Sequence, residues 1–242
     1  MKFWILFCLV CSLSVLSSCK KDDNSQKISA ATPKLSFQLK YEVDGQMVYT
    51  DTILYSTAAG YPYSIVTLYY YLSQISLIKS DGTPVLVKDY QYSSFLDATT
   101  NFFSVYSPPK GSYSGIRFNI GIDAAHNVPD SLPANSDNNN MIWPLFMGGG
   151  FHFLKFEGKF SDSMGTYGFA MHLGKNQNLV TVILDKNFTI GDSDVLLGLT
   201  MNLNKWFQNP YNYDFIIDGN YSMSNPDAMT KLSVNGKDVF HF

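Results

Sequence analysis

From Lys34 onward, apolar and polar residues alternate with a period of two, in short runs rich in Val, Ile, Tyr and Phe. Such runs, bounded by turn residues, are typical of half-buried strands. Asp-Gly turns at Val43–Gln46 and Ser80–Thr83 favour hairpins, because this residue pair readily supplies a positive φ. The pattern predicts strands at Lys34–Val43, Gln46–Thr50, Ile65–Ile78, Val85–Asp89, Gly111–Ile120, Phe151–Phe160, Thr166–His172, Leu179–Leu184 and Val195–Asn202.

Strands of this length and spacing predict an all-β protein with an antiparallel β-sandwich. Helical periodicity is credible only near Tyr90–Leu96 or Asn204–Phe207. Neither an internal repeat nor a second composition regime interrupts residues 34–242, so we expect them to form a single domain.

The N-terminus has a different pattern. Met1–Ser18 carries one Lys and then an apolar run too short for a comfortable membrane span, which predicts a lipoprotein signal peptide over residues 1–18. Leu16–Cys19 resembles the bacterial lipobox, so we expect lipid on Cys19; several acyl chains anchor a protein stably, whereas one binds only marginally. Residues 19–33 are polar and aperiodic, which predicts a flexible tether.

The residues directly after Cys19 bear on localisation. The sequence KKDDN places Lys and acidic side chains there, and this resembles the surface-export signal of lipoproteins from the Bacteroidetes. We therefore expect an outer membrane lipoprotein at the cell surface. A periplasm-facing position is the alternative.

Charge and composition exclude several classes of function. The net charge is −3 and Arg117 is the only Arg, so the basic stripe needed for nucleic-acid binding is absent. Nucleophile-elbow, phosphate-loop and zinc-protease motifs are absent too, and the only Glu residues are Glu42 and Glu157. The three Cys are Cys8 and Cys11, which leave with the signal, and lipidated Cys19, so no disulfide and no Cys nucleophile is expected. We expect a protein that is not an enzyme.

Histidine is the candidate chemistry, because imidazole is a common ligand of copper and zinc. Strand alternation in YGFAMHLG places His172 among small residues, on the face opposite Met171, which leaves room for an ion or a partner side chain. The same rule groups His152 with apolar neighbours and puts Lys155 and Glu157 on the other face, where they could pair. The alternative reading of His172 is a histidine hydrogen-bonded inside the sandwich, and that of His152 is a packed or edge histidine.

The stretch NNNMIWPLFMGGG, before the strand that begins at Phe151, holds Trp143 and three glycines. Trp143 precedes Pro144 and is therefore pushed toward an extended conformation, where its ring could cap the sandwich or line a pocket. Gly148–Gly150 admit positive φ and a close approach of the chain.

The order of motifs resembles the MbnP-like family, which is associated with methanobactin-type gene clusters. The pieces that carry the resemblance are Val66–Gly82, Gly111–Asn127, Met141–Gly158, Phe169–Gly174, Met201–Phe207 and Ala228–Phe240. The resemblance implies a secreted or surface-attached β-sandwich that binds copper through histidine. It also implies, in some members, a tryptophan oxidised to kynurenine by a di-haem partner similar to cytochrome c peroxidases.

Two positions match the family and two depart from it. His172 falls on the histidine of a family motif, and Trp143 on the first of two tryptophans; position 145 is Leu where many relatives have the second. Tyr41 stands where many relatives carry a first-strand His, and a neutral phenol is a poor copper ligand.

The resemblance and the residues together predict a copper site. We expect His172 and His152 as ligands, with Trp143, Tyr41, Met141 and Glu157 as surrounding or pocket residues. Two alternatives belong to other classes: a surface module that binds glycan or protein through its many aromatic rings, and a family scaffold that has lost its metal site.

Overall fold

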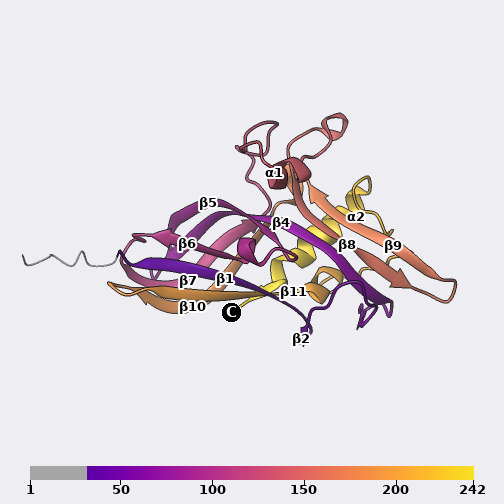
Figure 1. The fold of residues 1–242 in the computed structure, drawn as a ribbon, viewed down its shortest axis with the longest axis horizontal. Coiled ribbons are helices and arrows are strands. Elements are labelled where there is room, and N and C mark those ends of the chain that lie inside the picture. Colours follow the sequence, from indigo (N-terminus) through magenta and orange to yellow (C-terminus); the bar gives the residue numbers. More distant parts are fainter. Residues whose placement is uncertain (1–31) are drawn as a thin grey trace, which may run out of the picture. The chain divides into compact units, whose positions relative to one another are not determined.

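Strands are the main secondary structure of the computed structural model, which describes residues 32–242; the predicted signal peptide, Cys19 and most of the predicted tether lie outside the described residues. Thr32–Phe242 forms one compact unit of two sheets (Figure 1). The five-stranded sheet contains β1 (Lys34–Val43), β2 (Gln46–Met47), β6 (Phe102–Tyr106), β11 (Val195–Asn202) and β12 (Phe240–His241). The seven-stranded sheet contains β3 (Tyr55–Ser56), β4 (Pro62–Lys79), β5 (Pro84–Ser94), β7 (Gly111–Ile120), β8 (His152–Ser161), β9 (Thr166–Gly174) and β10 (Val180–Ile190).

Helices are short and connect or cover the strands. The α-helices are α1 (Ser136–Asn140) and α2 (Pro226–Asn235), and the 3-10 helices are η1 (Ala98–Asn101), η2 (Leu145–Met147), η3 (Asn176–Asn178), η4 (Leu203–Phe207) and η5 (Gly236–Asp238). Among the described residues, no helix is long and apolar enough to cross a membrane.

The predicted all-β sandwich is confirmed, with three corrections. β1 pairs with β11 in parallel, whereas the other pairs between named strands are antiparallel. Tyr90–Leu96 is not a helix, because β5 continues through Ser94 against β4. The helix α2 was not predicted, although Asn225 as N-cap followed by Pro226 is a start signal that the sequence contains.

The long strand β4 divides the larger sheet into two halves. Tyr63–Tyr70 pairs with β8 and Leu72–Lys79 pairs with β7, while β5 occupies the other edge along Tyr69–Ile78. β7 and β8 therefore follow one another along a single edge of β4. The connection between them, residues 121–151, leaves at this fork and rises from the sheet with α1 (Figure 1).

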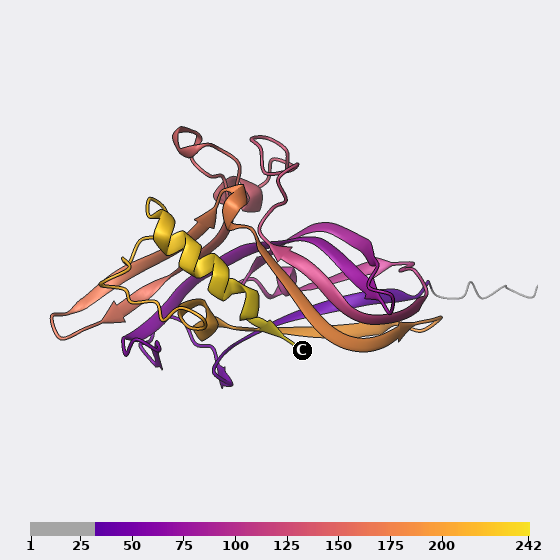
Figure 2. The ribbon, with the colours of Figure 1, turned by 180° about the vertical axis from the view of Figure 1, so that it is seen from behind.

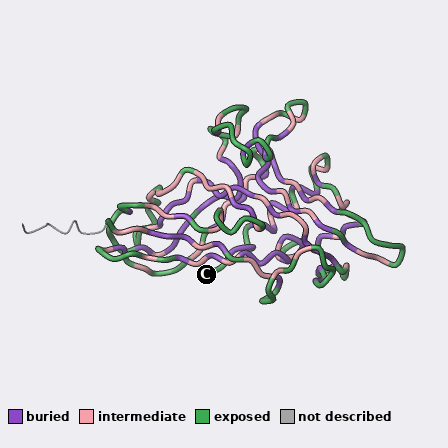
Figure 3. The backbone as a smooth tube through the Cα atoms, in the orientation of Figure 1, coloured by how far each residue is buried: buried purple, intermediate pink, exposed green. Residues whose placement is uncertain are grey.

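The inner face of the larger sheet is covered differently in its two halves. On β7, Phe118 packs edge-on against Phe240 of the smaller sheet, with ring centres 5.2 Å apart. On β8, Phe156 stacks on Phe207 of η4 at 5.4 Å, and α2 lies beyond on the same face of the unit, in yellow in Figure 2. Buried positions accordingly follow the strands, and exposed positions gather in the loops (Figure 3). These elements cover only the inner face of the sheet, and the side chains on the outer face of β8 and β9 make separate contacts.

Candidate metal site

His172 lies on the outer face of the larger sheet, as strand alternation predicts. In the register of β8 with β9, Lys155 is opposite His172 and Leu154 is opposite Leu173. Leu154 and Leu173 are fully buried in the core, whereas His172 is half-buried on the other side. The predicted orientation of His172 is therefore confirmed.

His152 lies on the same outer face, and the prediction that it points with Leu154 and away from Lys155 is wrong. The register shifts between His152 and Leu154, because Phe153 is an extra residue that bulges out of the pairing. His152 is consequently opposite Gly174, two residues along β9 from His172. A bulge re-aims the side chains that precede it. Here it brings the two histidines together.

Four side chains form a continuous row, which we call the His-pair cluster: Trp143, His152, His172 and Glu157. The ring centres of Trp143 and His152 are 4.7 Å apart, and those of His152 and His172 are 4.9 Å apart. Nε2 of His172 lies 2.8 Å from Oε1 of Glu157. An ionised carboxylate only accepts hydrogen bonds, so Nε2 carries the proton and donates it to Glu157.

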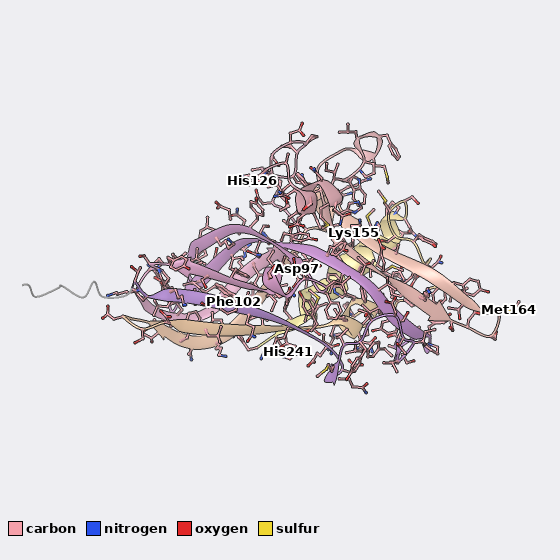
Figure 4. The ribbon with its side chains drawn as sticks, in the orientation of Figure 1. Asp97, Phe102, His126, Lys155, Met164 and His241 are labelled. Atoms are coloured by element: carbon pink, nitrogen blue, oxygen red, sulfur yellow. The ribbon has the colours of Figure 1, made fainter. Side chains whose placement is uncertain are left out.

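Glu157 thus contacts His172 and forms no ion pair with Lys155, the partner that alternation suggested. Lys155 instead donates at 3.4 Å to Asn140, at the base of the connection 121–151. Figure 4 shows Lys155 on β8, below the loops that hold His126. Lys155 therefore ties β8 to this connection.

Backbone contacts fix both histidines. The N–H of His172 donates to Oγ of Ser222 at 2.6 Å, and that hydroxyl donates to the His172 carbonyl at 2.7 Å. The N–H of His152 donates to the carbonyl of Met141 at 2.6 Å. The carbonyl of the fully buried Met141 thus holds the backbone of His152.

Trp143 reaches the cluster from the connection 121–151. The backbone N–H of Trp143 donates to the carbonyl of Gly150 at 2.9 Å, and this contact holds the residue beside the start of β8. Its ring lies against Gly174, where a Cβ atom would overlap the indole. Gly174 is therefore the reason that a fully buried tryptophan can sit flush with His152.

Burial and hydrogen bonding shift the pKa values of two groups in the cluster, His152 and Glu157. Burial, with smaller contributions from the neighbouring His172 and Lys155 in the same direction, lowers the pKa of His152 to about 3. The hydrogen bond from His172 lowers the pKa of Glu157, although partial burial opposes this. His152 is therefore a neutral imidazole at physiological pH, and Nδ1 of its ring is buried with no hydrogen-bond partner among the described residues.

The structure does not bring Tyr41 to this cluster. Its hydroxyl donates to Oδ1 of Asn101 at 2.6 Å and lies 2.9 Å from the hydroxyl of Tyr70. Tyr70 is opposite Leu154 in the β4–β8 register, so it faces the core, on the other side of the sheet from His172. Burial raises the pKa of Tyr41 well above its ordinary value, which makes this phenol a still poorer ligand.

Two further histidines lie elsewhere. His126 contacts Asp123 at 2.8 Å, and His241 contacts Glu42 at 3.3 Å; Figure 4 shows them on opposite sides of the molecule. Across residues 32–242, no three or more His, Cys, Asp or Glu side chains are grouped to hold a metal ion. Any metal at the His-pair cluster would therefore take two imidazoles from the protein.

Sequence reasoning named every member of the cluster but not its assembly. The period of two placed His172 correctly, and a single bulged residue was enough to reverse the prediction for His152. Nothing in the local pattern around Phe153 signals the bulge. The pairing of Glu157 with His172 depends on the register between β8 and β9, which neither strand encodes alone.

The comparisons with known proteins give one family and one solved structure. The family model described as MbnP matches residues 32–225. The structure of MbnP from Methylosinus trichosporium is similar, with a TM-score of 0.51 and 14% sequence identity, over 73% of this chain and 78% of that one. At 14% sequence identity, this similarity shows the fold alone. No curated protein matches the chain.

Proposed function

The chain belongs to the MbnP family, and from this premise we propose that it is a non-enzymatic surface lipoprotein that binds copper between His152 and His172. The observation that carries the proposal is the pair of imidazoles 4.9 Å apart on one face of the sheet. Imidazole nitrogens bind a metal at about 2.0–2.1 Å, so rings this close can share an ion.

The donor atoms fit a copper ion. Glu157 accepts a hydrogen bond from the Nε2–H of His172, which leaves Nδ1 as the nitrogen with a free lone pair; metal-binding histidines commonly show this carboxylate contact. Nδ1 of His152 is buried without a partner, which is unfavourable unless another atom contacts it. Two neutral imidazoles suit copper among the common metals.

The low pKa of His152 favours copper binding even in mildly acidic solution. A ligand nitrogen must be deprotonated, and a pKa of about 3 means that protons do not compete for this ring near neutrality. Bound copper would supply a one-electron redox centre beside the indole of Trp143. Trp143 and Glu157 would then orient the two ligands from either end of the row.

The proposal includes an anchor and a partner. Lipid on Cys19 would hold the protein to the outer membrane, facing outward, with a periplasm-facing position as the alternative. A di-haem protein similar to cytochrome c peroxidases would oxidise Trp143. Because Trp143 is fully buried, such a partner would withdraw electrons over a distance rather than by contact with the ring.

Copper titration of the purified protein tests the site. We expect one equivalent to bind, and we expect His172→Ala and His152→Ala each to weaken the affinity at least tenfold, because each removes one of two ligands. His126→Ala is the matched control, since His126 also contacts a carboxylate but lies in a loop. Unchanged affinity in both cluster variants would reject the His-pair cluster as the copper site, and a wild-type protein that binds no copper would leave only a family scaffold without its metal.

Glu157→Gln tests the orientation of His172 within the same titration. The variant keeps an oxygen acceptor but loses the charge, and contacts of this kind typically contribute 10- to 100-fold to metal affinity. Glu42→Gln is an unusually close control, because Glu42 is the only other Glu in the chain and also contacts a histidine. Equal losses in the two variants would mean that the effect is one of net charge.

Intact mass and metal analysis of the protein from its own host tests the anchor and the partner together. Lipidation predicts the mass of the acylated chain that begins at Cys19, and oxidation of Trp143 predicts the further mass of one kynurenine conversion. A chain that still carries residues 1–18 would contradict the anchor.

The tryptophans give no support to the alternative of a glycan-binding module, which would have to use the exposed tyrosines. Both tryptophans of the described residues, Trp143 and Trp206, are fully buried and present no ring face to a sugar. A glycan array with specific hits, together with a failed copper titration, would favour that alternative.

A further inference from the structure

The connection 121–151 contains an apolar cavity of ≈ 180 Å³ with a mouth at the protein surface. The lining residues Leu132 and Phe151 are buried and form its floor. Other lining residues are exposed and form its rim, among them Ala134, Ile142 and Leu145. Leu145 is 74% exposed, although it lines the cavity. An apolar group from outside the chain can therefore enter through this rim.

The same connection carries the most exposed of the large apolar side chains in the described residues. Phe146 is 89% exposed and directly follows Leu145 in η2, so it stands beside the rim of the cavity. A phenyl ring held in water gains free energy when it is buried. Large exposed apolar groups of this kind often mark an interaction site.

The volume of the cavity matches a phenyl ring. An apolar protein cavity of about 150 Å³ is known to accommodate one benzene molecule. A cavity of ≈ 180 Å³ is therefore large enough for the ring of Phe146 from another copy of the chain. Because ring and cavity lie side by side on one connection, a two-fold axis between them lets two copies make the same contact twice.

We propose that two copies of this chain form a two-fold dimer in which Phe146 of each copy enters the cavity of the other. The connection 121–151 rises from the sheet (Figure 1), which leaves room for two connections to meet ahead of the sheets. Neither His152 nor His172 lines the cavity, so the dimer forms with or without copper.

The buried area sets the strength of this dimer. Each Phe ring buries about 150–250 Å². The two rings, together with the walls that receive them, remain below the roughly 1,200 Å² at which stable interfaces begin. We therefore expect a dimer in rapid exchange, with a dissociation constant in the high micromolar range.

The charges of the connection predict how salt acts on the dimer. The connection holds Asp123, Asp130 and Asp137 but no Lys or Arg, and Asp130 lines the cavity. Two copies that meet here bring these like charges together. Added salt screens the repulsion, so it should strengthen the dimer.

Sedimentation velocity of the purified, unlipidated protein over a range of concentrations measures self-association. We expect Phe146→Ser, which removes the ring, and Ala134→Phe, which obstructs the mouth, each to weaken the dimer at least tenfold. Both positions are exposed, so neither variant disturbs the core. Ile217→Ser is the matched control, since Ile217 is 83% exposed but lies in another segment. A wild-type protein that stays monomeric at millimolar concentration, or a Phe146→Ser variant that associates like wild type, would overturn the proposal.

A photoreactive ring tests which surfaces meet. Phe146 is replaced by p-azidophenylalanine, which keeps the phenyl ring, and this variant is mixed with nitrogen-15-labelled wild-type protein. Light should then join labelled to unlabelled chains at cavity residues such as Leu132 and Phe151. Cross-links that join the two chains only at other segments, or that form only within one chain, would contradict the proposed contact.

A bilayer is the competing occupant for the exposed ring. Co-sedimentation of the unlipidated protein with phosphatidylcholine vesicles measures this alternative, and we expect the protein to remain in the supernatant. Vesicle binding that is lost in Phe146→Ser, by a protein that is monomeric in solution, would assign the ring to the membrane and refute the dimer.

Discussion

His152 is unusual as a single residue. It is 5% exposed, its Nδ1 has no partner among the described residues, and burial lowers its pKa to about 3. An unsatisfied buried polar atom in a native protein calls for an explanation, such as a bound ion. A hydrophobic residue of similar size would pack at this position at lower cost. The buried, unpartnered imidazole therefore supports the proposed role of His152 as a ligand.

The depressed pKa of His152 predicts how stability depends on pH in the metal-free protein. An unfolded imidazole binds its proton near pH 6.5, whereas folded His152 binds it only near pH 3. Below pH 6.5 the unfolded state thus holds more protons, so the free energy of unfolding falls by up to about 1.4 kcal/mol per pH unit from this residue. That contribution is complete above pH 6.5 and is lost as the pH falls toward 3.

Urea unfolding of chelator-treated protein between pH 6.5 and 4.5 measures this slope. The lower limit keeps the measurement from going below the ordinary pKa of the Glu157 carboxyl, 4.5. His152→Leu should reduce the slope by up to about 1.4 kcal/mol per pH unit, whereas His126→Leu serves as the loop control. A His152→Leu protein with the wild-type slope would show that the ring is solvated in the folded state.

At the scale of elements, the bulge in β8 and the glycine opposite His152 build the cluster together. Phe153 leaves the pairing, which puts His152 opposite Gly174. Gly174 has no Cβ, so Trp143 can pack where a side chain would otherwise stand. The bulge of β8, the strand β9 and the connection 121–151 therefore come into contact at Gly174.

Gly174→Ala should consequently destabilise the protein. The new Cβ would overlap the Trp143 ring, which is fully buried, and overpacking of this kind costs about 1–3 kcal/mol. Gly198→Ala in β11 is the matched strand control, since a Cβ there meets nothing within 4 Å. Urea unfolding compares the two variants. The close packing of Trp143 on β9 would be disproved if Gly174→Ala were as stable as Gly198→Ala.

At the scale of the whole described unit, the larger sheet depends on the C-terminal segment. The half of the sheet that carries His172 packs its inner face against η4 and α2 rather than against the smaller sheet. The match to the family model ends at residue 225, before α2 and β12. Those last elements nevertheless bury Leu232, Val239 and Phe240.

Removal of Pro226–Phe242 should therefore prevent cooperative folding. Each large apolar side chain contributes about 1.5–3 kcal/mol on burial, and the sum over the segment approaches the 5–15 kcal/mol net stability of a typical domain. Leu232→Ala is the milder version and should cost about 2–5 kcal/mol; exposed Lys237→Ala is its control. Thermal unfolding monitored by circular dichroism provides the measurement. A truncated chain with an unchanged midpoint would show that α2 is dispensable.

Much of this protein follows from its sequence alone. A period of two along each strand identified most of the sheet segments and the outward face of His172, because one buried face forces apolar residues into alternate positions. The residues of the cluster were recognisable by their chemistry, since histidines, a tryptophan and one of only two Glu lie in two short stretches.

Tertiary structure decided how those residues meet. The parallel pairing of β1 with β11 joins segments distant in the chain, and alternation is the same whichever way a strand runs. The bulge at Phe153 depends on the partner strand, and the position of Tyr41 on the core side follows from the packing of one sheet on the other. Periodicity records which face of a strand is buried; only the folded chain determines which strand lies beside it, in which register, and therefore which side chains share a site.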